Sequence, residues 1–268
     1  MSVETHNPAE GYEDYMGPAL FAPCAERLIA VASPEPGERV LDLATGTGIV
    51  ARKLATRVGP GGTVTGLDIS PGMLAVARDR AAREGATIDW VEGRAEALPF
   101  PDGAFDLVTC QFGLMFFSDK AAALREVRRV LAPDGRVALN VFQEIRRHPF
   151  YVRLDEVIQA RFGLSGVRDI FALGDQDHLR DLFAAAGFDA VDIQPWDMVA
   201  RFPDPDVFIA GEIDVDTAAI PAMQQVDAGQ RAAIVAELAD RMRDDLAAVT
   251  ASDVVAMPYE TWIVTATR

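Results

Sequence analysis

Residues 40–51 decide the fold of this chain, and they read Val-Leu-Asp-Leu-Ala-Thr-Gly-Thr-Gly-Ile-Val-Ala. An apolar pair runs into an acidic residue, a turn of small residues follows, and an apolar run with helical spacing begins at Ile49. This order is typical of the strand, glycine loop and helix start of a nucleotide-binding βα unit. Gly46 and Gly48 can take positive φ at little cost. A second acid, Asp68, ends another strand-like run about 20 positions after Gly48, which is the spacing of a ribose-binding carboxylate.

The pattern around this stretch alternates between strand and helix. Strands are expected at 39–43, 63–68, 87–92, 105–110 and 136–142, with helices at 49–58, 71–84 and 121–131. Ser70 is the expected N-cap of the second helix, and the turn Pro133-Asp134-Gly135 is expected to end the third. Such alternation predicts an α/β fold with a Rossmann-like, mostly parallel sheet, helices on both faces, and ligands at the carboxyl edge of the strands.

The flanking segments predict additions to this core. Residues 8–33, 150–162, 177–186 (closed by Gly187) and 228–249 look helical, residues 190–202 resemble one or two strands interrupted at Pro195, and residues 259–267 suit an antiparallel last strand. The expected sheet therefore has seven strands. We expect a single domain over 1–268, with an N-terminal helical lid at 1–35, a cofactor-binding core at 39–142, and cap insertions at 145–176 and 204–250 over the substrate edge.

The bulk properties narrow the class of partner. The chain has 268 residues, 50% of them hydrophobic, and a formal net charge of −16. That charge repels a phosphate backbone, so no nucleic-acid partner is expected, although solubility alone would also explain it. Cys24 and Cys110 form neither a disulfide framework nor a metal-ligand spacing, and we expect Cys110 to be a buried small hydrophobe. No signal peptide or membrane-spanning segment is recognised, so we expect a cytoplasmic protein.

The residues around the glycine loop disfavour other classes of nucleotide-binding protein. A P-loop needs Gly-Lys-Ser/Thr, whereas this loop continues Gly48-Ile49-Val50. A short-chain dehydrogenase usually has a Tyr-x-x-x-Lys pair, but neither Lys53 nor Lys120 stands four residues after a tyrosine. The three histidines form no zinc signature, so no metal is expected.

Five blocks of sequence, in order, resemble the class I S-adenosylmethionine-dependent methyltransferases, in particular the small-molecule group that includes the ubiquinone and menaquinone C-methyltransferases. The blocks are residues 40–48 (similar to motif I), 66–74 (the second-strand segment), 90–102 (the adenine-side loop), 105–114 (the fourth-strand motif) and 125–135 (the helix and turn before strand five). The resemblance covers the first half of the chain and hardly reaches the cap segments.

The resemblance implies S-adenosylmethionine as cofactor and assigns residues to its parts. Asp42 would orient the glycine loop and reach the cofactor amino group, and Asp68 would accept hydrogen bonds from the ribose hydroxyls. Ile69 and Met73 would sandwich the adenine, and Tyr15 would close over the cofactor. The other implied contacts are the loop backbone at Ala44, Thr45, Gly46, Thr47 and Gly48, the adenine edge at Gly93, Arg94, Ala95 and Glu96, and the methionine end at Gln111 and Phe112.

Several of these residues have a structural alternative, and two depart from the family. Asp42 or Asp68 could simply cap a loop or helix, Met73 could fill the core, Glu96 could be a solvated acid at a helix start, and Tyr15, like Tyr12, could pack in the core. The family commonly has glycine at position 44 and an acid at position 94. Because arginine has no acceptor, adenine would here be read by backbone groups or by Glu96.

The expected function is methyl transfer from S-adenosylmethionine to carbon or oxygen of a small, largely apolar organic acceptor. Aromatic residues after the fourth strand and in the caps could line its pocket. His148, just after the fifth strand, is the candidate base, the alternative being a surface loop histidine. A protein of the same fold that uses the cofactor as a cyclase or a sensor is the alternative function. We expect no membrane insertion, and a homodimer is left open.

Overall fold

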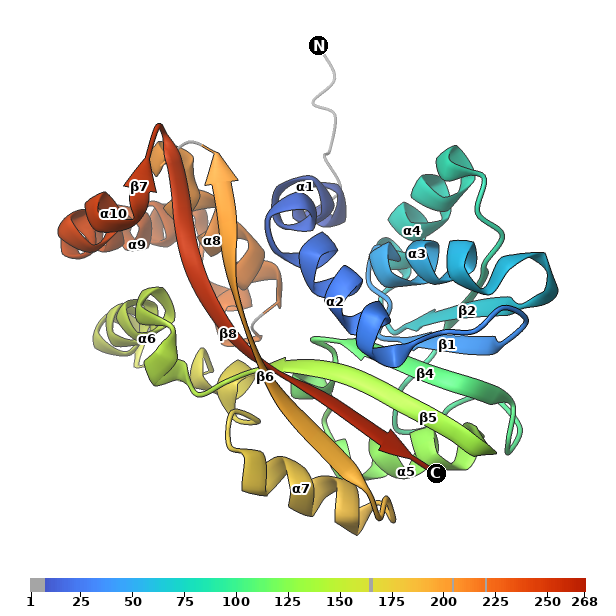
Figure 1. Ribbon diagram of the computed structural model, residues 1–268. Helices are drawn as coiled ribbons and strands as arrows, with labels where there is room; N and C mark the ends of the chain where they lie inside the picture. Colours follow the sequence, from blue (N-terminus) through green and yellow to red (C-terminus); the bar gives the residue numbers. More distant parts are fainter. Residues whose placement is uncertain (1–7, 164–165, 204, 220) are drawn as a thin grey trace. The chain divides into compact units, whose positions relative to one another are not determined.

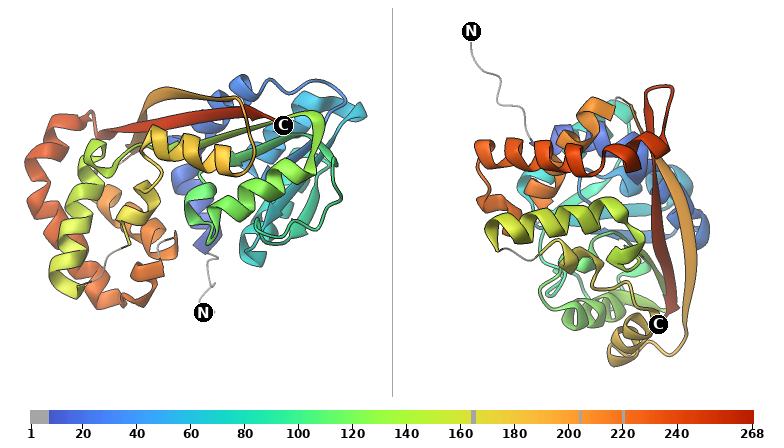
Figure 2. Two further views of the ribbon diagram at one scale, coloured as in Figure 1. Left: turned by 90° about the horizontal axis from the view of Figure 1, so that it is seen from below. Right: turned by 90° about the vertical axis from the view of Figure 1, so that its left-hand side faces the viewer.

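The computed structural model describes residues 8–163, 166–203, 205–219 and 221–268. The chain divides into two compact units: one holds the residues up to Val141 together with Asp175–Pro195 and Trp262–Arg268, and the other holds Phe142–Gly174 and Trp196–Thr261. The first unit contains the glycine loop, and the second contains most of both expected cap segments. Figure 1 labels the helices and strands, and Figure 2 shows them from two further sides.

The sheet has the mixed topology of a Rossmann-like fold. Its strands are β1 (Arg39–Leu43), β2 (Thr63–Asp68), β3 (Asp89–Glu92), β4 (Phe105–Gln111), β5 (Leu131–Phe142), β6 (Val191–Pro203), β7 (Thr250–Ala251) and β8 (Val254–Thr267). The order is β3-β2-β1-β4-β5-β8-β6, with β7 attached to β8. The pairs among β1 to β5 are parallel, and the C-terminal strands are antiparallel. The predicted fold class is thereby confirmed, with the short β7 as an eighth strand.

Helices cover both faces of the sheet in the first unit. They are α1 (Pro8–Met16), the π-helical turn η1 (Gly17–Phe21), α2 (Ala22–Ala32), α3 (Ile49–Val58), α4 (Pro71–Glu84), α5 (Lys120–Val130) and α7 (Gln176–Ala185), with short 3₁₀ turns η2 (Gly59–Gly61) and η3 (Leu114–Phe116). Figure 1 shows α2, α3 and α4 on one face and α5 and α7 on the other. Between these layers Val40, Leu41 and Leu43 of β1 are buried, as expected for a central parallel strand.

Local sequence signals explain the ends of these helices. The Ser70 hydroxyl accepts a hydrogen bond from the Met73 N–H at 3.3 Å, so Ser70 is the N-cap of α4 as predicted. Gly85, with φ of +69°, ends the same helix. Gly187, with φ of +88°, follows the C-cap of α7. The predicted bounds of α3 and α4 are confirmed.

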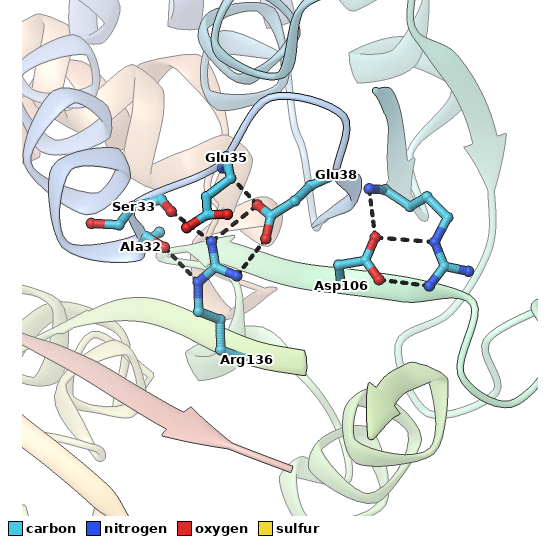
Figure 3. A network of polar contacts seen from close by, with 7 residues as sticks. Ala32, Ser33, Glu35, Glu38, Asp106 and Arg136 are labelled. Carbon is cyan, nitrogen blue, oxygen red and sulfur yellow. Dashed lines mark hydrogen bonds and ion pairs between the residues drawn. The ribbon is translucent and has the colours of Figure 1, made fainter. Parts of the chain in front are cut away.

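An arginine at the amino-terminal edge of the sheet holds the connection into β1 (Figure 3). Arg136 of β5 donates to the carbonyls of Ala32 and Ser33, each at 2.7 Å, and to Glu38 at 2.7 Å. A cation at these carbonyls is favourable because they form the negative end of the α2 dipole. Beside it, Asp106 accepts from the Arg39 guanidinium at 2.6 Å. These contacts fix the start of β1 and therefore the direction in which its carboxyl end projects.

The second unit is mainly helical. Its helices are α6 (Pro149–Phe162), α8 (Pro205–Ala219), α9 (Ala228–Arg241) and α10 (Arg243–Val249), with turns η4 (Ile145–Arg147), η5 (Arg168–Phe171) and η6 (Pro221–Gln225). Helix α9 begins at a capping box between Asp227 and Gln230 and packs on α6 and α8. None of the helices described in either unit is long and apolar enough to cross a membrane.

Several predicted boundaries were wrong. Strand β6 runs through Pro195 without interruption, because β6 is an edge strand, where a residue without an N–H is tolerated. Helix α5 ends at Val130, and Leu131 is already extended and begins β5. The turn Pro133-Asp134-Gly135 therefore lies inside the span of β5 instead of ending the helix. Strand β3 is shorter than expected and begins at Asp89. Residues 1–7 of the expected lid, and 164–165, 204 and 220 of the expected caps, lie outside the described residues.

Candidate functional site

The glycine loop between β1 and α3 is built from alternating left-handed residues. Ala44, Gly46 and Gly48 have φ of +54°, +55° and +82°, and the Thr45 N–H donates to the Leu67 carbonyl at 2.9 Å. A Cβ at Gly48 would come within 2.6 Å of the Trp90 ring, whereas a Cβ at Gly46 would meet nothing within 4 Å. Gly48 is therefore required for packing. The space at Gly46 is open, and a ligand could approach the backbone there.

Asp42, at the carboxyl-terminal end of β1, orients this loop. Its side chain is buried, and its two oxygens accept hydrogen bonds from the Thr45 hydroxyl at 2.5 Å and from the Thr109 hydroxyl at 2.8 Å. Burial raises the pKa of Asp42 to about 6, against the lowering effect of these hydroxyls. The loop-orienting role is thus visible in the contacts, and the contact with a cofactor amino group stays a prediction.

Asp68, at the end of β2, joins the glycine loop to the start of α4. One oxygen accepts from the Gly46 N–H at 2.8 Å and the other from the Ser70 N–H at 2.9 Å. Burial raises the pKa of this carboxyl. A carboxylate offers about four acceptor positions, so acceptor capacity remains for hydroxyl groups of a ligand. The neighbouring Ile69 is 57% exposed, and its apolar side chain is available to cover a flat ring.

The end of β4 carries strain and an unsatisfied acceptor. Phe112 has φ of +53°, and its N–H donates to the Asn140 carbonyl at 3.2 Å and to Asn140 Oδ1 at 3.1 Å. Gln111 donates from Nε2 to the Phe21 carbonyl at 3.1 Å. Its Oε1 is buried and has no partner among the residues that the structure describes. A strained backbone beside an orphaned acceptor is typical of a ligand site.

The N-terminal helix brings Tyr12 near this site. The Tyr12 ring stacks on Phe21 at 4.8 Å between centroids. Burial raises the pKa of Tyr12, and the negative charges of Asp68 and Glu13 raise it further, so its hydroxyl lies within electrostatic reach of Asp68. Tyr15, the tyrosine expected to close over the cofactor, is half-buried on the same helix, and its contact with the cofactor stays a prediction.

A buried ion pair ties α1 to the glycine loop, and sequence reasoning missed it. Arg52 of α3 donates to Glu13 Oε1 at 2.7 Å, to the Thr47 carbonyl at 2.5 Å and to Glu84 at 3.0 Å. Glu13 also accepts a short hydrogen bond from the Thr47 hydroxyl. Arg52 and Glu13 are both buried. The available signal was Arg52 itself, a charged residue between the apolar positions of α3.

The adenine-side loop uses its acid within the protein. Glu96 Oε1 accepts from the Ser118 N–H at 2.9 Å and from the Ser118 hydroxyl at 2.7 Å. Although burial acts in the opposite direction, these bonds hold the pKa of Glu96 below its ordinary value. Arg94 is exposed and donates to the same hydroxyl at 3.2 Å. These contacts join the loop to the start of α5, so Glu96 is not simply a solvated acid. Its contact with adenine stays a prediction.

His148 lies in the second unit among aromatic rings. Its ring centroid is 4.9 Å from Phe171, 5.6 Å from Phe142, 6.1 Å from Tyr259 and 6.5 Å from Tyr151. Only 2% of the residue is exposed, so the surface-loop alternative is wrong. Both ring nitrogens lack a hydrogen-bond partner in the described part of the chain. Burial, assisted by the nearby Arg147 charge, lowers the pKa of His148 to about 4, so the ring is neutral at physiological pH.

Glu212 of α8 is another buried titratable group in that unit, and sequence reasoning missed it. It is 0% exposed. Its Oε2 accepts from the Tyr151 hydroxyl at 3.1 Å and from the Tyr259 hydroxyl at 3.4 Å, and burial raises its pKa to about 7. The signal was its position four residues after Phe208, which places an acid on the buried face of the helix.

The two cysteines are buried. Cys24 and Cys110 form no disulfide in the part of the chain that the structure describes, and the expected burial of Cys110 is confirmed. Within the described ranges, no three histidine, cysteine or acidic side chains come together as a metal site.

The comparisons with known proteins agree with this geometry. A methyltransferase domain model matches residues 40–135. The ubiquinone/menaquinone biosynthesis C-methyltransferase UbiE of Xanthomonas campestris pv. campestris is 40% identical over 190 residues, which cover 65% of this chain and 75% of that protein. UbiE of Stenotrophomonas maltophilia is 50% identical over 119 residues, 44% of this chain and 47% of that protein. The matched segment spans about half the length of several of these relatives.

A solved structure shares the fold, and the site fits the family's cofactor. YcgJ of Bacillus subtilis superposes with a TM-score of 0.62 at 23% identity, over 91% of this chain and 97% of that one. The acceptor capacity of Asp68 suits the ribose hydroxyls of S-adenosylmethionine, the open space at Gly46 suits close backbone approach, and the orphaned Gln111 oxygen suits an ammonium group. The chain therefore belongs to the S-adenosylmethionine-dependent methyltransferase family that includes the ubiquinone/menaquinone C-methyltransferases.

Proposed function

We propose that this enzyme methylates a ring carbon of a small quinone-type acceptor in its reduced, hydroxylated form. The Asp68 carboxylate, joined to the Gly46 N–H beside open space, carries the methyltransferase assignment. The acceptor class comes from the relatives, whose names give ubiquinone, menaquinone and demethylmenaquinone as the compounds concerned. The proposal narrows the expected choice between carbon and oxygen to carbon.

S-adenosylmethionine supplies an electrophilic methyl group on its sulfonium. In this proposal, residues of the first unit bind the cofactor. In this proposal Asp68 accepts from both ribose hydroxyls, and Ile69 and Met73 cover the adenine. Gln111 Oε1 accepts from the ammonium group, which would satisfy the orphaned oxygen. The remaining contacts in the proposal come from the backbone of Ala44, Thr45, Gly46, Thr47 and Gly48, from the Gly93–Ala95 backbone at the adenine edge, and from Phe112, Tyr12 and Tyr15. Alignment of this kind supplies much of the acceleration of a displacement reaction.

Methylation at carbon also needs a group that takes a proton from the acceptor. His148 is the residue expected from the sequence, and as a neutral imidazole it has a lone pair that can accept one. A pKa of about 4 makes it a weak base, because efficient proton transfer favours a pKa near the working pH. We therefore propose His148 as a hydrogen-bonding partner of the acceptor.

The experiment is a methylation assay with the full chain and labelled S-adenosylmethionine. The panel contains short-chain hydroquinones of the benzene and naphthalene series, the corresponding oxidised quinones, and simple phenols. We expect a C-methylated product from hydroquinones, identified by mass spectrometry, and none from the Asp68→Ala variant. Label transfer to RNA or protein alone would contradict the proposal, as would methylation of phenol oxygen without any product at carbon.

The same proposal covers location and assembly. We place the enzyme in the cytoplasm with a small-molecule acceptor and without a nucleic-acid partner, since a net charge of −16 opposes phosphate binding. A homodimer stays a prediction that light scattering of the purified chain decides.

A further inference from the structure

Glu212 stands at the centre of a buried cluster formed by distant parts of the second unit. Tyr151 comes from α6, Glu212 from α8 and Tyr259 from β8, and both tyrosine hydroxyls donate to the same carboxylate oxygen, Oε2. His148 lies 6.1 Å from the Tyr259 ring and 6.5 Å from the Tyr151 ring, measured between centroids. Phe142 and Phe171 complete the aromatic surroundings. We name these six residues the Glu212 cluster.

The polar groups of the cluster are only partly satisfied. Glu212 Oε1 and both nitrogens of His148 are buried and have no hydrogen-bond partner in the described part of the chain. Folded proteins rarely leave such atoms unpaired, because a buried polar group without a partner is costly. Here three of them occur in one cluster, and together they offer an acceptor on the carboxylate and both an acceptor and a donor on the neutral imidazole.

The cluster follows the core motifs along the chain. Its first residue, Phe142, is the last residue of β5. The other members belong to the segments that follow the core motifs, beyond the residue at which the methyltransferase domain model stops. Segments added to a common catalytic core usually determine the substrate.

We propose that the Glu212 cluster recognises a hydroxyl group on the aromatic ring of the methyl acceptor, with Glu212 Oε1 taking the hydroxyl hydrogen and His148 binding a second oxygen. This inference rests on the proposed function and adds the residues that select the acceptor. The flat faces of Phe142 and Phe171 suit an aromatic ring. A ring without a free hydroxyl would leave Oε1 unpaired and would be rejected.

The chemistry at Glu212 is a single proton transfer. The acceptor O–H bond breaks, its electron pair stays on the acceptor oxygen, and the proton forms a new bond to Glu212 Oε1. The resulting oxyanion raises the electron density of the adjacent ring carbons, which is what attack on a methyl group requires. The pKa of Glu212, raised by burial to about 7, suits this role better than that of His148, because it is matched to physiological pH.

The hydroxyls of Tyr151 and Tyr259 position the carboxylate. Both hydroxyls donate to Oε2, so Oε1 remains available to the methyl acceptor. Solvent does not reach Oε1 or the His148 nitrogens, so an acceptor ring must part the aromatic side chains to enter. Its polar groups then pair with those three atoms, and this pairing favours the occupied state.

The test measures how tightly the 268-residue chain and its variants, each with S-adenosylhomocysteine bound, bind two acceptor probes. The probes are 1,4-naphthohydroquinone, kept reduced, and 1,4-dimethoxynaphthalene, which has the same ring without O–H groups. Variants are Glu212→Gln, Tyr151→Phe and, as a matched control, Glu156→Gln, an exposed carboxylate on α6. We expect the wild type and Glu156→Gln to bind the hydroquinone at least tenfold more tightly than the ether. For Glu212→Gln, the two affinities should differ by less than threefold. S-adenosylhomocysteine affinity should stay within twofold throughout.

The outcomes separate this inference from the proposed function. A Glu212→Gln protein that binds S-adenosylhomocysteine normally and keeps the wild-type preference overturns the inference, even if the wild type methylates hydroquinones. A Glu212-dependent preference without any methylation supports the recognition site and overturns the proposed function. If Glu212→Gln does not fold, Tyr151→Phe decides: its preference should fall at least threefold below that of the wild type, and an unchanged preference overturns the inference.

Discussion

The glycine loop of the first unit and the Glu212 cluster of the second treat buried polar groups in opposite ways. In the loop, both oxygens of Asp42 and both oxygens of Asp68 accept hydrogen bonds from the protein. In the cluster, Glu212 Oε1 and the nitrogens of His148 have no partner within the described ranges. The loop is thus organised before a ligand arrives, whereas the polar groups of the cluster are completed by a ligand in our proposal.

The first unit carries backbone strain in the glycine loop and directly after β4. Ala44 and Phe112 both have positive φ, a conformation that costs about 1–2 kcal/mol for a residue with a Cβ. The hydrogen bonds of Asp42, Asp68 and Asn140 offset that cost and hold the geometry. In the cluster, the unfavourable contribution comes from buried polar atoms without hydrogen bonds. The two regions should therefore respond differently to substitution and to pH.

The largest loss of stability is expected from breaking the buried Glu13–Arg52 ion pair of the first unit. Glu13→Ala removes the buried carboxylate partner of Arg52 and an acceptor of the Thr47 hydroxyl, and leaves Arg52 only its pair with the exposed Glu84. Because a solvated carboxylate compensates a buried charge only in part, the free energy of unfolding should fall by about 3–4 kcal/mol. Urea denaturation measures it. Lys53→Ala, which breaks the exposed pair with Glu26, is the control and should cost less than about 1 kcal/mol. An equally small loss for Glu13→Ala would show that Arg52 is readily solvated.

His148 should make the second unit sensitive to acid. Its folded pKa, about 4, lies below the ordinary value of 6.5, so the unfolded chain binds more protons between these values and stability falls as the pH drops from 6.5 to 4. The full shift corresponds to about 3 kcal/mol. His148→Phe removes this titration, so the variant should gain that amount relative to the wild type between pH 7 and pH 4. Urea denaturation at several pH values tests it, and parallel curves would contradict it.

Asp42 should give the first unit the opposite slope. Its pKa is raised from 3.8 to about 6, so the folded protein binds more protons between these values and stability falls as the pH rises from 4 to 6. The shift corresponds to about 3 kcal/mol. Asp42→Asn should therefore gain about that amount relative to the wild type between pH 4 and pH 7, measured by the same denaturation series. A loss over that interval would mean that Asp42 is stabilised as the anion.

Cofactor affinity tests the organisation of the loop directly. Asp68→Ala removes the proposed acceptor of the ribose hydroxyls, and hydrogen bonds to a charged group contribute about 1.5–3 kcal/mol. We expect S-adenosylhomocysteine to bind about 100-fold more weakly by calorimetry, which corresponds to about 2.7 kcal/mol. Ser70→Ala is the matched control: it removes the N-cap of α4 and should cost about 1 kcal/mol of stability with affinity within threefold. Equal affinities for both variants would exclude Asp68 from the site.

The first unit could be predicted well from the sequence because its determinants are local. The bounds of α3 and α4 follow from Gly48, Ser70 and Gly85, which stand at the helix ends. The loop and its two acids lie on adjacent parallel strands, whose carboxyl ends necessarily meet at one edge. Pro195 misled the prediction because tolerance of proline depends on whether a strand lies at an edge, and only the strand order shows that.

The cluster could not be predicted because its contacts join remote positions. Tyr151 and Tyr259 stand 61 and 47 residues away from Glu212, and Arg52 stands 39 residues away from Glu13. No periodicity fixes which helix faces meet at such separations, since these contacts depend on tertiary packing. His148 could be singled out by its place after the fifth strand, whereas its burial, and with it the direction of its pKa shift, needed the structure.

The smallest effect should come from the family difference at position 44. Ala44 has φ of +54°, so Ala44→Gly relieves about 1–2 kcal/mol of strain but adds about 0.5–1 kcal/mol of chain entropy to the unfolded state. The net gain in the free energy of unfolding should be below about 1 kcal/mol, with S-adenosylhomocysteine affinity unchanged within threefold. Ala51→Gly, inside the helical part of α3, is the matched control and should destabilise by about 1 kcal/mol. A loss of stability in Ala44→Gly would show that the strained residue is supported by its methyl contacts, and that the loop is held by packing as well as by its hydrogen bonds.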